Sequence, residues 1–392
     1  MIEHSFIQGY YSVGNEIFPN KLHAVRRAME TNTTVTWHYF DDVFNNVDKS
    51  NLGQISLDEL YKQRALQLRD SYDYLVLYYS GGADSWNILD TFLKNNIRLD
   101  CVAVFRPVQA ANNGIYTPNA IDDSGHNHLS EWDFIIKPDL EWLSNHHPEI
   151  HIEIIDWSSS LSTSINRFDS LIDVTNTQCS IATTLKSHSR CQYEDAKITA
   201  GKTVGKIFGV EKPKIVEKDG NCYFCFLDIT CISVNSPDNP NGLEYFYISP
   251  KFPLLTVEQS FRIYSCYKND PLSRFNIKAW SLRVDQVRNW TERDYHMSLT
   301  NREAHERKIL YPGWDMKKFQ ANKSMPNPSL PPGIRDWERP LIRLHEFREA
   351  SKKWSHHWES AIGNRIDNAF LFDIGSRLKG IYSKWHLLCK SQ

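Results

Sequence analysis

Residues 74–85 read YLVLYYSGGADS, an apolar run that passes into a polar turn with two glycines. The run is short, continuous and rich in β-forming residues, and glycines close it, so it predicts a buried parallel strand. From Asp84 onward, large apolar residues recur every three to four positions between Trp86 and Leu93. This spacing predicts a helix directly after the turn.

The sequence after this helix continues to alternate between strand and helix. Apolar strands are predicted at 101–105, 150–155 and 204–210, with helical sequence around 139–146 between the first two. Such alternation is typical of an α/β fold, and right-handed crossovers place the connecting helices on the faces of the sheet. We therefore predict a Rossmann-like, doubly wound parallel sheet.

Three regions are expected along the chain. Residues 1–70 form a short N-terminal helical leader region, residues 71–250 form the α/β domain, and residues 251–392 form a mostly helical C-terminal region. Inside the second region, the dipeptide Asp219-Gly220 lies between two β-prone runs and predicts a β-hairpin.

The glycine turn has the composition of a phosphate-binding loop. Gly81 and Gly82 let backbone N–H groups approach an anion, and the positive end of the following helix points at the same place. The hydroxyls of Ser80 and Ser85 can donate hydrogen bonds to phosphate oxygens. Asp84 would repel a bare phosphate, so its presence implies a Mg²⁺ ion between the two and favours a nucleotide as the ligand.

This turn matches every fixed position of the motif S-G-G-x-D-S, and over roughly residues 72–215 the chain resembles the PP-loop ATP pyrophosphatase superfamily. The superfamily includes the synthetase part of asparagine synthetase, GMP synthetase, argininosuccinate synthetase, RNA-thiolating enzymes and PAPS reductase. The resemblance implies that ATP and Mg²⁺ are the cofactors. It also implies that the nucleotide is held by Ser80, Gly81, Gly82, Ala83, Asp84 and Ser85.

The reaction that the resemblance implies is an adenylation. A substrate oxygen attacks the α-phosphorus of ATP, pyrophosphate leaves, and the adenylated carbon is open to ammonia, an amine or sulfide. An AMP-forming ligase or transferase acting on a small molecule or nucleotide is therefore expected. Two alternatives stay open: a sulfur-transfer or PAPS-reductase-like enzyme acting on a nucleotide or nucleic acid, and a non-catalytic nucleotide sensor or interaction protein. The chain has neither a Walker A sequence nor the G-x-S-x-G elbow of serine hydrolases.

The segment after the fourth predicted strand supplies further candidates. Gly209 would let the chain approach the ligand, and Lys212 is a candidate to hold a phosphate and to act with Asp84 in catalysis. Glu211 is a candidate second ligand, with Asp84, for Mg²⁺. The alternative for this segment is a surface turn before the hairpin.

Other polar residues are weaker candidates. Arg106 ends the second strand and would lie near the nucleotide base, or it caps the sheet edge. Lys186 and Arg190 could face phosphate, or they form an exposed basic surface. The loop residues 122–128, DDSGHNH, could contact a substrate, bind a metal or do neither.

The eight cysteines are scattered, which predicts reduced thiols and no disulfide framework. Cys222 and Cys225 are expected on a strand, where three residues of separation direct their side chains to opposite faces. We therefore favour packed free thiols over a metal or cluster site that would include Cys231. The sulfur-transfer alternative needs a reactive thiol near the turn, and Cys179 or Cys191 would supply it.

Residues 48–59 resemble an EF-hand calcium loop. Asp48, Gly53 and Glu59 occupy suitable positions, but Leu52 lies where a ligand is required and no second loop is visible. The capping-box pattern formed by Ser56 and Glu59 before a helix explains the same residues without calcium.

Composition limits the remaining possibilities. The chain has 392 residues, 41% of them hydrophobic and 23% charged, with no apolar stretch long enough to cross a membrane and no secretory signal at its start. A cytoplasmic protein without a membrane partner is expected. Residues 301–392 carry 17 Lys and Arg against 10 Asp and Glu, and seven of the 12 tryptophans lie between Trp280 and Trp385. Nucleic acid is therefore a possible partner of this region, although aromatic residues at helical spacing are more often core.

Overall fold

A computed structural model gives the fold. It describes residues 9–19, 21–106, 108, 132–156, 190–209, 212–228, 242–269, 309–314 and 382–390. The candidate residues Lys186, Glu211, Cys179 and Cys231 and the loop 122–128 lie outside the described residues, as does most of the region from 270 onward.

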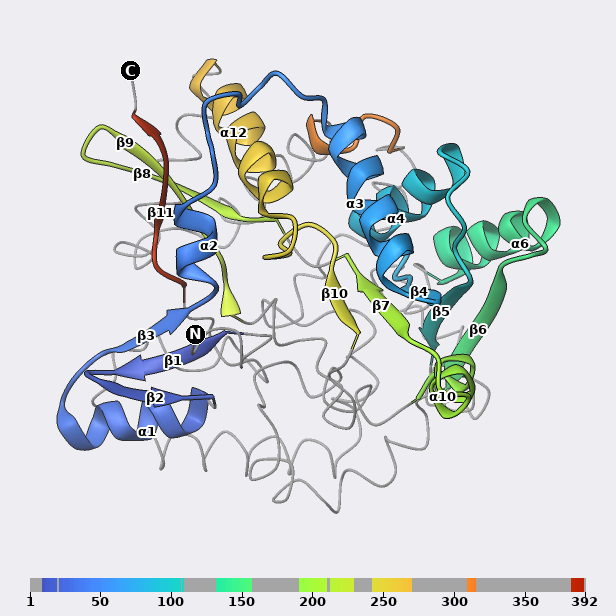
Figure 1. Ribbon diagram of the computed structural model, residues 1–392, viewed down its shortest axis with the longest axis horizontal. Coiled ribbons are helices and arrows are strands. Elements are labelled where there is room, and N and C mark those ends of the chain that lie inside the picture. The colour runs from blue at the N-terminus through green and yellow to red at the C-terminus, as the bar shows by residue number, and fades with distance from the viewer. Residues whose placement is uncertain are drawn as a thin grey trace, which may run out of the picture.

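Five parallel strands form the central sheet, in the order β10-β7-β4-β5-β6 (Figure 1). The strands are β4 (Tyr74–Tyr78), β5 (Cys101–Arg106), β6 (His151–Asp156), β7 (Val204–Phe208) and β10 (Leu243–Tyr245). The chain builds from β4 outward to β5 and β6, then returns to the other side of β4 to add β7 and β10. The predicted α/β fold with a parallel sheet is confirmed. The order of strands reverses next to β4, the strand that leads into the glycine turn.

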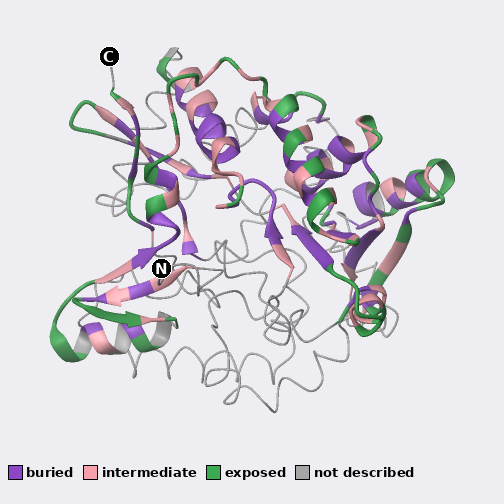
Figure 2. Cartoon of the chain, in the orientation of Figure 1, coloured by how far each residue is buried: buried purple, intermediate pink, exposed green. Residues whose placement is uncertain are grey.

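Both faces of the central strands are covered, which explains why β4 and β5 read as continuous apolar runs. Leu75 and Leu77 pack into the largest hydrophobic cluster together with residues of α3 (Leu57–Ser71), α4 (Ala83–Lys94) and α6 (Lys137–His146). Val76 points the other way, into a smaller cluster with residues of α10 (Gln192–Thr199). Figure 2 shows the resulting continuous burial of the central strands.

The N-terminal region is not simply helical, so that part of the prediction is wrong. The helix expected at 21–30 is present as α1 (Lys21–Thr31), but it packs on an antiparallel sheet of order β2-β1-β3. The strands are β1 (Tyr10–Val13), β2 (Glu16–Phe18) and β3 (Val35–His38), followed by the short α2 (Asp41–Asn45). Strands of three or four residues are too short to display the alternation by which a strand is recognised.

The predicted hairpin is confirmed as β8 (Lys214–Lys218) and β9 (Asn221–Cys225). Asp219 and Gly220 both have positive φ, +51° and +72°, as a tight two-residue hairpin turn requires. The hairpin does not extend the parallel sheet. Its partner is β11 (His386–Lys390), which pairs antiparallel with β9.

The C-terminal region contains both helix and strand in its described residues. The expected helical character is found in α12 (Pro253–Asn269), which follows β10 directly. The strand β11 was not predicted from the sequence. Its pairing partner is more than 150 residues away in sequence, so no local pattern indicates it.

The predicted cap of α3 is present, and it allows a direct test. The Ser56 hydroxyl accepts a hydrogen bond from the backbone N–H of Glu59 at 3.1 Å. Replacing Ser56 by Ala should lower the free energy of unfolding by about 1 kcal/mol, because an N–H in the first turn of the helix loses its partner. Urea unfolding measures this change.

Ser71→Ala is the matched control: Ser71 is also exposed, but its hydroxyl donates to a carbonyl in the last turn, so a change below about 0.5 kcal/mol is expected. Equal losses in the two variants would contradict the cap assignment.

None of the helices in the described part of the chain combines the length and the apolar composition that a membrane crossing requires.

Candidate functional site

The glycine turn joins the carboxyl end of β4 to the start of α4, for which Gly82 is the N-cap. Gly81 has φ +72°, and a Cβ there would lie 2.7 Å from Cγ1 of Ile136. A Cβ at Gly209, which follows the neighbouring strand β7, would lie 3.0 Å from the backbone nitrogen of Ser85. The turn and the end of β7 are therefore in close backbone contact, and a side chain at either glycine would crowd its neighbours.

The backbone of the turn presents a group of unpaired donors. The first hydrogen bond of the helix runs from the N–H of Trp86 to the carbonyl of Gly82 at 2.9 Å. Among the described residues, nothing accepts from the N–H groups of Gly81, Ala83, Asp84 and Ser85. Free N–H groups at a glycine turn and at the positive end of a helix are the usual components of an anion site.

The two serines of the turn have different surroundings. Ser85 is buried, and its hydroxyl donates to the carbonyl of Gly82 at 3.1 Å. The backbone N–H of Ser80 donates to the same hydroxyl at 3.2 Å. The hydrogen bonds of the buried Ser85 hydroxyl therefore stabilise the turn. Ser80 is exposed, so its side chain is the more accessible of the two to a ligand.

Asp84 is the best-connected residue of the turn. Its Oδ1 accepts from the Tyr311 hydroxyl at 2.5 Å and forms an ion pair with Nζ of Lys212 at 3.0 Å. Its backbone carbonyl accepts from the Tyr247 hydroxyl at 2.7 Å. Oδ2 has no hydrogen-bond partner within the described residues, and the side chain is 21% exposed. The structure thus brings the two predicted catalytic residues, Asp84 and Lys212, together.

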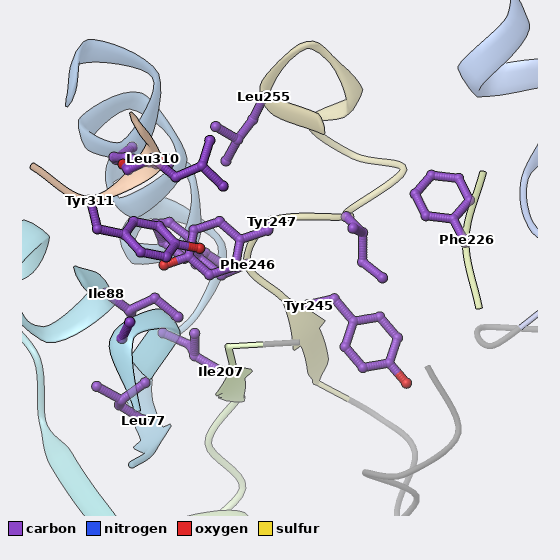
Figure 3. Close-up of a cluster of buried hydrophobic side chains, with 14 of the residues drawn as sticks. Leu77, Ile88, Ile207, Phe226, Tyr245, Phe246, Tyr247, Leu255, Leu310 and Tyr311 are labelled. Carbon is purple, nitrogen blue, oxygen red and sulfur yellow. The ribbon is translucent and has the colours of Figure 1, made fainter. Parts of the chain in front are cut away.

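Three buried tyrosines surround the base of this site. Tyr61 of α3, Tyr247 after β10 and Tyr311 have ring centroids 5.7 to 6.3 Å apart, and Figure 3 shows Tyr247 and Tyr311 side by side above Ile88. Burial, and secondly the charge of Asp84, raise the pKa of Tyr247 and of Tyr311 well above the ordinary value. Both hydroxyls therefore stay protonated and serve as permanent donors to Asp84.

Tyr311 belongs to a segment that sequence reasoning missed. Residues 309–314 read ILYPGW and lie beside α3 and α4 (Figure 1). Trp314 packs edge-on against Trp86 of α4 with centroids 5.4 Å apart, and a Cβ at Gly313 would lie 3.2 Å from the Trp86 ring. The Pro-Gly turn between the aromatic residues Tyr311 and Trp314 is the sequence signal that could have marked this packing segment.

Other predicted residues lie elsewhere or have other partners. Arg106 ends β5 as expected, with its guanidinium 3.9 Å from the ring centroid of Trp132. Arg190 is exposed and lies 3.8 Å from Asp195, so it belongs to the start of α10 and not to the turn.

Four of the described cysteines, Cys101, Cys191, Cys222 and Cys225, are buried thiols. Cys222 and Cys225 are buried in different hydrophobic clusters, which confirms that they point to opposite faces of β9. Burial raises the pKa of Cys225 to about 12. Cys191 lies on the α10 face of the sheet, with its thiol 3.3 Å from the Glu153 carboxylate. Across the described residues, no group of His, Cys, Asp and Glu is arranged to hold a metal ion.

The calcium-like loop 48–59 is occupied by protein contacts. The N–H of Gly53 donates to the Glu258 carboxylate of α12, and the guanidinium of Arg262 donates to the carbonyls of Gly53 and Ile55, both at 2.9 Å. These bonds dock the loop onto α12.

Comparison of this chain with protein-family models, with curated proteins and with solved structures gave no match. The functional interpretation therefore depends on the geometry of the turn and of the residues that contact it.

Proposed function

We propose that this chain is an ATP pyrophosphatase-type enzyme of the PP-loop kind. In this proposal, ATP and Mg²⁺ bind at residues 80–85, AMP is transferred to a substrate oxygen, and pyrophosphate is released. The observation that carries the proposal is the arrangement of four free backbone N–H groups beside one carboxylate oxygen, Oδ2 of Asp84, that also lacks a partner in the described residues. Donors for phosphate and a ligand for a cation thus lie on consecutive residues.

The position of the turn supports a nucleotide ligand. Ligands of open parallel sheets bind beyond the carboxyl ends of the strands, where the strand order reverses. Here the order reverses beside β4, and Gly209 brings the end of β7 against the turn. A ligand at this position agrees with the Rossmann-like sheet that the resemblance to the PP-loop superfamily implies.

The residues present suit a magnesium nucleotide. Oδ2 of Asp84 offers the kind of hard oxygen that Mg²⁺ prefers, and Mg²⁺ typically takes only one or two carboxylates together with phosphate oxygens. Bound there, the ion would supply positive charge to the β- and γ-phosphates. Glu211, the second predicted ligand, lies outside the described residues.

The chain's own residues then have distinct tasks. The N–H groups of the turn bind phosphate oxygens and orient the leaving group, and the ammonium of Lys212 adds a second positive charge. The acceptor oxygen forms a bond to the α-phosphorus, and the bond from that phosphorus to the bridging oxygen breaks, so that pyrophosphate leaves with the bridging oxygen. Rate enhancement comes from alignment and charge neutralisation, with no covalent enzyme intermediate.

No contact among the described residues favours the sulfur-transfer alternative. Of its two candidate thiols, Cys191 is held by Glu153 on the α10 face of the sheet. The nucleic-acid partner also stays a prediction, because most of the basic C-terminal region lies outside the described residues.

Calorimetry with ATP and Mg²⁺, followed by a pyrophosphate-release assay with candidate acceptors, tests this function. Binding with a dissociation constant between about 1 µM and 1 mM is expected, in the range of enzyme substrates. Gly81→Ala should abolish binding, because its Cβ would collide with Ile136 and displace the turn. Gly220→Ala is the matched control: it has the same φ of +72°, but a Cβ there meets nothing within 4 Å.

The outcomes separate the alternatives. Absence of nucleotide binding to the wild-type chain would remove the proposal. Binding without pyrophosphate release from any carboxylate, carbonyl, amide or ureido acceptor would instead favour the sensor. Equal binding by the two glycine variants would place the nucleotide somewhere other than the turn.

A further inference from the structure

A second group of chemically active side chains lies in the N-terminal antiparallel sheet. The hydroxyl oxygen of Ser12 in β1 is 2.9 Å from Nε2 of His38 in β3. Nδ1 of the same imidazole is 2.7 Å from Oδ2 of Asp41, the first residue of α2. The three side chains form a hydrogen-bonded chain from hydroxyl to imidazole to carboxylate. They lie on elements other than β4 and α4, which flank the turn at residues 80–85.

The protonation pattern of this chain follows from Asp41. Burial disfavours its charged form, but the hydrogen bond from His38 and nearby positive charge, including the ammonium of Lys384 3.7 Å from Oδ2, outweigh burial and hold the pKa of the carboxyl below its usual value. An ionised carboxylate only accepts hydrogen bonds, so Nδ1 of His38 must carry the hydrogen. In the neutral imidazole Nε2 is then an acceptor, and the Ser12 hydroxyl donates to it. A general base is thus aligned on the proton of a nucleophile.

The surroundings fix this geometry. The ring of Tyr10 stacks on the His38 imidazole, with centroids 4.6 Å apart and planes within 10°. Asp41 follows Phe40, which has φ +49°, a conformation that is rare for a bulky residue and is retained where packing enforces it. The N–H of Tyr39 lies 3.4 Å from Oδ1 of Asp41. The side chains of His38 and Asp41 are both nearly buried, at 10% and 9% exposed.

Ser12 lies on the side of its sheet that α1 does not cover. Its neighbours Tyr11 and Val13 are buried in the main hydrophobic cluster together with Ala24 and Ala28 of α1. Successive side chains of a strand point to opposite faces, so Ser12 points away from α1. Ser12 is half-buried, whereas its neighbours Tyr11 and Val13 are buried.

We propose that Ser12, His38 and Asp41 form a nucleophile, base and orienting group that cleave carboxylic esters. The Ser12 oxygen bonds to the ester carbonyl carbon while its proton passes to Nε2 of His38. The bond from that carbon to the alkoxy oxygen breaks, and the alcohol leaves with the proton from His38. Water then cleaves the acyl-serine by the same route, releasing a carboxylic acid and restoring Ser12. Asp41 is a positioning residue that holds the imidazole in the required tautomer. Such a triad is recognised by geometry and occurs on unrelated folds, so the absent G-x-S-x-G elbow does not argue against it.

A fluorophosphonate reagent tests the triad on the full-length protein, because it bonds to serines that a neighbouring imidazole activates and releases fluoride. Mass spectrometry is expected to find the adduct on Ser12, and Ser12→Ala should remove both this adduct and the hydrolysis of p-nitrophenyl acetate. His38→Gln and Asp41→Asn should each slow the labelling of Ser12 by about 10²- to 10⁴-fold, the usual contribution of a general base.

Thr36→Ala is the control variant, because Thr36 pairs directly with Ser12 across β1 and β3 but belongs to no part of the triad. It should label at the wild-type rate. Melting temperatures and far-UV circular dichroism are compared for all variants, so that loss of the fold is separated from loss of reactivity in a folded chain. A folded wild-type protein that gives no adduct on Ser12 would overturn the proposal. An adduct that forms equally fast in His38→Gln and Asp41→Asn would overturn it as well.

Discussion

Replacing Asp84 by Asn is expected to slow pyrophosphate release by about 10²- to 10³-fold, the size of effect seen when one preorganised charge-stabilising group is removed. The amide keeps the shape of the carboxylate, and its Oδ1 can still accept from the Tyr311 hydroxyl that lies 2.5 Å from it in the wild type. The negative charge is lost, so the side chain no longer attracts a divalent cation and no longer balances Lys212. Steady-state kinetics with varied Mg²⁺ should show that added magnesium does not restore the rate.

Asp90→Asn provides the matched control for this variant. Asp90 lies on the same helix, is also partly exposed, and its carboxylate is 3.2 Å from Nζ of Lys94 four residues later. A surface pair of this kind contributes about 0 to 1 kcal/mol and has no part in the turn, so an unchanged rate is expected. An Asp84→Asn enzyme that keeps more than half of the wild-type rate would mean that the cation is bound elsewhere.

Replacing Glu244 by Gln is expected to lower the free energy of unfolding by about 3 to 5 kcal/mol, the cost of leaving a buried charge without its partner. Glu244 of β10 is 3% exposed, and its Oε2 lies 2.8 Å from Nη2 of Arg64, which is 1% exposed. The same carboxylate also accepts from Tyr72 and from Lys251. Urea unfolding of wild type and variant measures the difference.

The control for Glu244 is Glu141→Gln in α6. Glu141 is 64% exposed and lies 3.8 Å from Nζ of Lys137, so its removal should change the unfolding free energy by less than about 1 kcal/mol. Comparable losses in the two variants would show that burial does not set the strength of the Arg64 pair.

The pH dependence of stability gives a second measurement of Glu244. Burial raises its pKa, but the charge of Arg64 and hydrogen bonds from Lys251, Tyr72 and Arg64 outweigh burial and lower the pKa below the ordinary 4.5. A carboxyl with a depressed pKa in the folded state stabilises the fold above its unfolded pKa, and this contribution is lost as the pH falls through the folded value. The stability difference between wild type and Glu244→Gln should therefore shrink below about pH 4.5.

The elements that the sequence predicts correctly are those whose signals are local. The run at 74–79, the glycine turn and the helix after it lie within 20 residues, and Asp219-Gly220 determines its hairpin alone. The pairing of Asp84 with Lys212 could be anticipated because parallel strands of one sheet end at the same edge.

The tyrosines of the site could not be anticipated in this way. Tyr247 and Tyr311 lie 163 and 227 positions after Asp84, and both are ordinary aromatic residues in sequences without a motif. The hydrogen bond of Ser12 to His38 likewise depends on the register of two strands too short to be recognised. Contacts made by tertiary packing leave no periodic trace in the chain.

The pairing of β11 with β9 has a consequence for the order in which this protein is made. While the chain emerges from the ribosome, β4 and α4 become available early and next to each other, whereas β9 must wait for residues 386–390. Until β11 pairs with it, the edge of β9 that faces away from β8 has unpaired backbone N–H and C=O groups. Such an edge promotes aggregation, and chaperones shield it.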